Sequence, residues 1–135
     1  QFGLTSRHWM KSHILRLTPT VDALINNAAM YAKKRKLTAG GFESTMAVNH
    51  FAPFLLALSL LPQLVAAENA RVVTVSSIRD GARISLYLTT SAKVASITGK
   101  YFVDCLEQSS SATSRDAHLA AALWAISRHS LATYL

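Results

Sequence analysis

Two short apolar segments of the chain end abruptly in polar side chains that could hold a ligand. Asn26 and Asn27 follow the first segment, and Ser76 and Ser77 follow the second. The residues between the two segments show helical spacing, and a strand–helix–strand unit of this kind forms a parallel sheet. Ligands bind beyond the carboxyl ends of parallel strands. We therefore expect the four side chains at one ligand-binding edge.

A second candidate group is the main-chain carbonyl of Asn49, within the helical pattern of residues 42–67. Pro53 lies four residues later and has no N–H, so this carbonyl cannot accept its normal helical hydrogen bond. A free carbonyl at a helix bend can bind a water molecule. The alternative is an ordinary proline kink with a solvent-filled gap. Either way, the sequence predicts a broken or bent helix between residues 49 and 53.

The elements that must position these groups are spread along the chain. Helices are predicted at residues 6–17, 42–67 and 81–90, and strands at 21–25, 71–77 and 100–104. A polar linker at 109–114 precedes a final amphipathic helix, which Asp116 caps. The stripe of that last helix consists of Leu119, Leu123, Ile126 and Ser130, with Trp124 beside it. This order predicts an α/β fold: a partial Rossmann-type, doubly wound three-layer fold with a small, mostly parallel sheet flanked by helices.

Several motifs in this frame resemble one family. The segments Leu-Ile-Asn-Asn-Ala-Ala at 24–29, Val-Asn-His at 48–50 and Val-Thr-Val-Ser-Ser at 73–77 are similar to the central part of the short-chain dehydrogenase/reductase family. The loop 35–43, the segment 99–105 and the pair Leu123-Trp124 resemble its retinol-dehydrogenase-like branch. The resemblance covers most of residues 21–78 and 81–130.

The resemblance implies hydride transfer between NAD(P) and a small-molecule carbonyl or alcohol substrate. It places Asn26, Ala28 and Ala29 against the cofactor, with Ala29 standing where the family usually has glycine. It gives Asn49 a catalytic role, holding a water through its main-chain carbonyl, and Ser77 the role of steadying the substrate oxygen. Without the family, Asn26 and its neighbour could simply tie adjacent strands together, and the two serines would only indicate a turn.

Two parts of the family pattern do not occur in this sequence. One is the Tyr-x-x-x-Lys pair, because Tyr87 and Lys93 are six residues apart and diverge by about 120° on a helix. The other is the Gly-x-x-x-Gly-x-Gly loop that holds the pyrophosphate. The chain therefore looks like a truncated, internally deleted member: a single incomplete NAD(P)-binding Rossmann-like domain with a central block at 1–78 and a C-terminal block at 79–135. We expect it to be inactive as written. The alternative is a non-enzymatic dimerisation or interaction module, a possible homo-oligomer.

Composition excludes other classes of function. The net charge of +7 includes one dense cluster, residues 33–36, which has no interleaved aromatic residues and is better explained as a solvated loop than as a nucleic-acid site. The five histidines and Cys105 show no metal-ligand spacing, so no metal site is expected. The most apolar stretch, 51–67, contains Pro53 and Pro62 and is not expected to span a membrane. With no visible signal peptide and a single cysteine, we expect a cytoplasmic protein.

Overall fold

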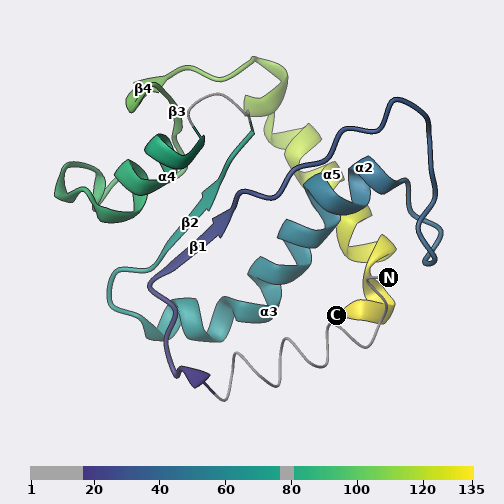
Figure 1. The fold of residues 1–135 in the computed structure, drawn as a ribbon, viewed down its shortest axis with the longest axis horizontal. Helices are drawn as coiled ribbons and strands as arrows, with labels where there is room; N and C mark the ends of the chain where they lie inside the picture. The colour runs from purple at the N-terminus through teal and green to yellow at the C-terminus, as the bar shows by residue number, and fades with distance from the viewer. Residues whose placement is uncertain (1–16, 77–80) are drawn as a thin grey trace.

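A two-stranded parallel sheet lies at the centre of the fold (Figure 1). The computed structural model describes residues 17–76 and 81–135. Strand β1 (Ala23–Asn26) pairs with β2 (Arg71–Thr74), and the register runs from Ala23 opposite Arg71 to Asn26 opposite Thr74. The prediction of a parallel strand–helix–strand unit is confirmed, although β2 ends at Thr74, earlier than the sequence suggested.

One continuous helical run connects the two strands. It consists of α2 (Ser44–Met46), the π-helical turn η1 (Ala47–Phe51) and α3 (Ala52–Ala66). Leu60 and Leu64 of α3 pack on Leu24 of β1, and these three side chains are the buried core cluster on that face of the sheet. Burial of a leucine stabilises a fold by about 1.5–3 kcal/mol, so this contact fixes the helix against the strands.

The sheet carries helices on both faces. Leu24 pairs in register with Val72, so the neighbouring Val73 projects to the opposite face. Helix α3 covers the Leu24 face, while α4 (Gly81–Thr90) contacts β2 from the Val73 side. The result is helix, sheet, helix, which confirms a partial Rossmann-like α/β fold with three layers.

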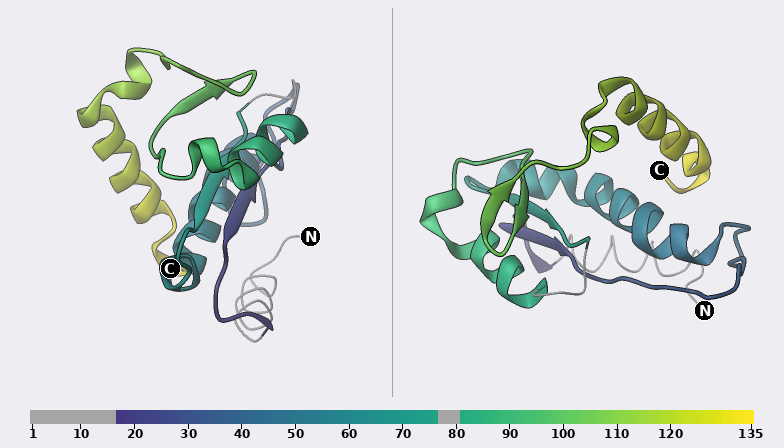
Figure 2. Two further views of the ribbon diagram at one scale, coloured as in Figure 1. Left: turned by 90° about the vertical axis from the view of Figure 1, so that its left-hand side faces the viewer. Right: turned by 90° about the horizontal axis from the view of Figure 1, so that it is seen from above.

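The predicted strand at 100–104 does not join the parallel sheet. After the short helix η2 (Ala92–Val94), β3 (Tyr101–Val103) pairs antiparallel with β4 (Leu106–Gln108) as a separate two-stranded hairpin. Asp104 and Cys105 between them have φ values of 51° and 63°. Two successive residues with positive φ make the tight turn that reverses a chain between adjacent strands. The hairpin and α4 lie together at the end of the molecule away from the C-terminus (Figure 2).

The last helix begins where the sequence predicted, but its contact face is different. The chain runs from η3 (Thr113–Arg115) into α5 (Ala117–Ser130), then η4 (Ala132–Tyr134). An Asp116 carboxylate oxygen accepts hydrogen bonds from two N–H groups of the first turn of α5, which confirms the cap. The predicted stripe is wrong as a buried face, because its members Leu119, Leu123 and Ile126 are 51%, 48% and 59% exposed. The face with Trp124 and the fully buried Ser127 packs on the helical run instead.

Two sequence predictions, the helix at 6–17 and the absence of a membrane span, are not tested by the structure. The predicted helix at 6–17 and the serine at position 77 lie outside the described residues, apart from Leu17. Within the described residues, the run Ser44–Ala66 has 23 residues and a mean hydropathy of 1.5, enough by length and composition to cross a membrane. Core helices of soluble proteins meet the same criteria. The absence of a membrane span therefore stays a prediction.

Candidate functional site

The carboxyl ends of β1 and β2 meet at one edge of the sheet, as expected. The Val75 N–H donates to the Asn26 carbonyl over 3.0 Å, and the Asn26 side-chain amide donates to the Thr74 hydroxyl over 3.4 Å. The Asn26 side chain therefore ties adjacent strands together, which was the alternative interpretation of this residue. Asn27 is exposed at the same edge.

The loop after β1 is held by Asn49 from the facing helical run. The Met30 N–H donates to Oδ1 of Asn49 over 2.8 Å, and Nδ2 of Asn49 donates to the Met30 carbonyl over 2.9 Å. The Asn49 amide thus bonds both the N–H and the C=O of one residue, as the backbone of a neighbouring β-strand would. The two sequence-predicted segments, the strand end at 24–29 and the helix at 48–50, are thus brought together.

The backbone around Asn49 has the bend that the sequence predicted, and its form is a π-helical turn. The Ala52 N–H donates to the Ala47 carbonyl, five residues back instead of four. Pro53 follows directly, and its missing N–H removes the partner that an α-helix would give the Asn49 carbonyl. Single π-helical turns of this kind occur frequently at functional sites. The sequence indicated a break here and could not show its type.

Ala28 and Ala29 lie in the exposed loop between Asn26 and Met30. Among the described residues other than glycine, positive φ occurs at Asp104 and Cys105, so the backbone at Ala29 does not demand glycine. An alanine at this position is therefore accommodated without strain.

The serines after β2 are only partly described. Ser76 is exposed just beyond the strand, and Ser77, the predicted catalytic serine, lies outside the described residues. Tyr87 and Lys93, which the sequence analysis did not accept as a catalytic pair, do not lie on one helix. Tyr87 belongs to α4 and Lys93 to η2, and Ser91 between these elements has extended backbone (φ −74°, ψ 127°).

The start of the helical run is closed by a carboxylate. Glu43 accepts hydrogen bonds from the N–H groups of Thr45 (3.0 Å) and Met46 (2.9 Å). These backbone donors, Thr45 first, hold the pKa of Glu43 below its ordinary value of 4.5. Because free N–H groups at a helix start are what binds phosphate, this end is already occupied by the chain's own anion.

The described residues supply only part of a site for NAD(P), the cofactor that the family binds. The edge with Asn26, Ala28 and Ala29 is open. The helix that follows β1 offers no free N-terminus to a pyrophosphate, because Glu43 fills it. Among the described residues, the exposed loop at Ala28 and Ala29 leaves the strand-end side of a dinucleotide site open, whereas the start of this helix offers no phosphate site. Within residues 17–76 and 81–135, no three histidine, cysteine or acidic side chains gather to hold a metal ion.

One interaction near the site was not anticipated from the sequence. Nε2 of His50, next to Asn49, lies 2.7 Å from Oγ of Ser127, and Phe54 meets Trp124 edge-on with ring centroids 4.9 Å apart. These contacts dock α5 against the π-helical turn and the first turn of α3. The available signal was a pair of spacings: His50 and Phe54 are four residues apart on one helix, and Trp124 and Ser127 three apart on the other. The His50 side chain thus joins the helical run to α5.

The basic cluster lies in a loop, where the sequence predicted one. Lys33, Lys34, Arg35 and Lys36 are all exposed. The loop returns to the fold through the bridge between Leu37 and Glu43.

Comparison with known proteins places this geometry in one family. The model of the family described as short chain dehydrogenase matches residues 6–107, most of the chain. The chain belongs to the short chain dehydrogenase family. No solved structure matches the chain significantly.

Three curated relatives show the range of similarity. The dehydrogenase/reductase SDR family member FEY of Arabidopsis thaliana is 43% identical over 65 residues, 47% of this chain and 17% of the relative. Protochlorophyllide reductase B of Oryza sativa is 40% identical over 81 residues, 56% of this chain and 20% of the relative. Human retinol dehydrogenase 12 is 47% identical over 55 residues, 41% of this chain and 17% of the relative. The matched parts thus span about a fifth of each relative or less.

Proposed function

We propose that the chain carries the strand-end part of an NAD(P)-dependent oxidoreductase site for a carbonyl or alcohol substrate and does not transfer a hydride by itself. In this proposal, residues 1–78 and 79–135 form one incomplete domain. The observation that supports it is the pair of hydrogen bonds between Asn49 and Met30. They hold the loop after β1 against a π-helical turn that Pro53 follows, and Pro53 has no N–H to donate to the Asn49 carbonyl as an α-helix would require.

Each group has a defined task in this proposal. The Asn49 carbonyl holds a water at the helix bend, and Ser77 steadies the substrate oxygen. The loop at Ala28 and Ala29 forms the floor on which a nicotinamide cofactor, which supplies the hydride when bound, would lie. Among the described residues, Tyr87 and Lys93 lie on different helices and do not form a proton-donating pair. Loss of a general acid alone costs a factor of about 10²–10⁴ in rate.

Titration of the purified chain with NADPH and NADH, followed by cofactor fluorescence, tests the cofactor part. With the phosphate side of the site unfilled, we expect dissociation constants above about 1 mM for both. An Ala29→Gly variant provides the matched control, since it restores the residue usual in the family without adding a phosphate site, and we expect it to bind no more tightly. Saturable micromolar binding by the unaltered chain would refute the proposal.

A second candidate function, a dimerisation module, is favoured by the last helix. Leu119, Leu123 and Ile126 are about half exposed along one face of α5, next to Trp124 at 50%. Apolar stripes of this kind cover one another in helix pairs. Light scattering over a range of concentrations decides between the candidates: a dimer that a Leu123→Glu substitution dissociates supports the module, and a monomer at all concentrations removes it.

A further inference from the structure

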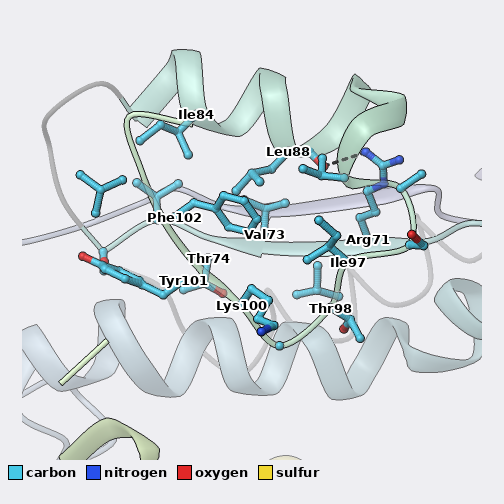
Figure 3. A pocket seen from close by; sticks show the side chains of 18 of the residues that line it. Arg71, Val73, Thr74, Ile84, Leu88, Ile97, Thr98, Lys100, Tyr101 and Phe102 are labelled. Carbon is cyan, nitrogen blue, oxygen red and sulfur yellow. Dashed lines mark hydrogen bonds between the residues drawn. The ribbon is translucent and has the colours of Figure 1, made fainter. Parts of the chain in front are cut away.

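A cavity of about 760 Å³ lies between β2 and the residues that follow α4 (Figure 3). Its walls are β2 itself, Ile84 and Leu88 of α4, and the segment 94–104, which includes β3. The cavity runs along the whole length of β2, on the side that does not hold the candidate site residues of β1. Nothing in the proposed oxidoreductase function uses this space.

One wall of the cavity is an unpaired strand edge. The Arg71 N–H donates to the Asp22 carbonyl (2.9 Å) and the Val75 N–H to the Asn26 carbonyl (3.0 Å). Backbone groups alternate sides along a parallel strand, so residues 71, 73 and 75 face β1, and those of Val72 and Thr74 face away from it. Within the described residues, the N–H and C=O groups of Val72 and Thr74 have no backbone partner.

The opposite wall offers a second such edge. In the hairpin, Val103 and Leu106 flank the two-residue turn, so they exchange hydrogen bonds with each other, and Tyr101 does the same with Gln108. Phe102 between them turns its N–H and C=O away from β4. Phe102 lines the cavity, and β2 and β3 belong to separate sheets.

Four apolar side chains of the cavity lining are still exposed to solvent. Val72, Ile97, Tyr101 and Val103 are 51%, 40%, 42% and 41% exposed, and all four line it. The three charged side chains of the lining already have partners. Arg71 donates to the Leu88 carbonyl (2.8 Å), Lys100 pairs with Glu107 (2.9 Å) and Asp104 with Arg83 (3.0 Å).

The cavity has the volume of one strand. A residue in a sheet occupies about 3.3 Å along the strand, about 4.8 Å toward the next strand and about 10 Å between layers, or roughly 160 Å³. The cavity therefore accommodates roughly four or five residues, and β2 itself has four. Open backbone donors and acceptors along its walls specify an extended polypeptide and not a compact apolar ligand, which would leave them unsatisfied.

We propose that this cavity binds one extended, uncharged peptide segment of another protein, rich in β-branched residues, which adds as a strand to the free edge of β2. The backbone of the segment pairs with Val72 and Thr74, and its far edge lies toward Phe102. Alternate side chains cover Val72 and Ile97. This is recognition by strand addition, in which main-chain hydrogen bonds give affinity and pockets for alternate side chains give specificity.

Amide hydrogen exchange of the full chain, read by NMR, tests the proposal. The probe is the soluble peptide acetyl-Thr-Val-Thr-Val-Thr-amide at increasing concentration. We expect the amide protons of Val72, Thr74 and Phe102 to exchange at least about tenfold more slowly when the peptide is bound. The amides of Ala23 and Ile25 are the internal control, because they lie on the outer edge of β1 in the same sheet and should not change.

A peptide with the same side chains, N-methylated at alternate residues, separates strand addition from simple apolar binding. Because methylation at alternate residues blocks one edge of a strand only, two such peptides are used, each with one of the two edges methylated. A one-to-one mixture does not restore pairing on both edges, and neither peptide should slow Val72, Thr74 and Phe102 together. Equal effects of the methylated and unmethylated peptides would overturn the proposal, as would slowing at Ala23 and Ile25 or no slowing at all. Slowing at Val72 and Thr74 without peptide, increasing with protein concentration, would show that a second copy of the chain fills the cavity and would also overturn it.

Discussion

Replacing Asn49 by alanine removes both hydrogen bonds that hold the loop after β1. The bonds measure 2.8 Å and 2.9 Å, and both are to the backbone of Met30. A neutral hydrogen bond contributes about 0.5–1.5 kcal/mol net. Both partners are exposed here, so the pair belongs in the lower half of the summed range, and we expect Asn49→Ala to cost the closed loop about 1–2 kcal/mol. A free-energy change of that size is a factor of about 5–30 in the population of the open loop.

Hydrogen exchange at the Met30 amide measures this population directly. We expect exchange in Asn49→Ala to be faster by that factor, with no comparable change at Leu24 in the core of the sheet. Asn69→Ala, on an exposed turn, is the matched control and should leave Met30 unaffected. Asn49→Asp keeps the acceptor for the Met30 N–H but places a second oxygen against the Met30 carbonyl, so its effect should be intermediate. Unchanged exchange at Met30 in the alanine variant would show that Asn49 does not hold the loop.

Three other substitutions test separate parts of the fold. The pKa of Glu43 is lowered in the folded chain by backbone N–H donors, so its stabilising effect is present above about pH 4.5 and is lost as the pH falls through the folded pKa. The loss of thermal stability in Glu43→Gln should therefore be largest near neutral pH. A loss that does not depend on pH would contradict this. Ser127→Ala leaves His50 without its 2.7 Å hydrogen-bond partner and should lower the free energy of unfolding, measured in urea, by about 1–3 kcal/mol. Ser130→Ala on the same helix is the control and should not lower it. Equal effects of the two substitutions would mean that the hydrogen bond does not stabilise the fold. Cys105→Gly relieves a φ of 63° and should stabilise the chain by about 1 kcal/mol in thermal unfolding, while Cys105→Ala should not; a destabilised glycine variant would argue against the two-residue turn.

The sequence predicted those parts of the structure that local chemistry decides. The apolar segments before Asn26 and Ser76 become the paired strands, because β-branched runs that end in polar residues have few other stable arrangements. The missing N–H of Pro53 marks the position of the helix break, and Asp116 caps the last helix. Each of these signals lies within five residues of the feature it predicts.

The parts that the sequence could not predict depend on contacts between distant residues. Periodicity assigned Leu119, Leu123 and Ile126 to a buried stripe, but the partner that α5 meets is the π-helical turn, which contacts the face with Ser127 instead. The bond from Asn49 to Met30 crosses 19 positions, and no local pattern indicates it. The strand at β3 was predicted, but its hairpin with β4 was not, because the turn at Asp104 and Cys105 carries no glycine.

We propose that these residues build part of a hydride-transfer scaffold without the group that moves the proton. Oxidation of NADPH by the purified 135-residue chain, followed at its absorbance with retinaldehyde or a simple aldehyde as substrate, tests this most directly. We predict a rate indistinguishable from that of the buffer and unchanged in the Asn49→Ala variant. Turnover at ordinary enzyme rates of about 1–10³ s⁻¹, abolished by the same substitution, would contradict the claim.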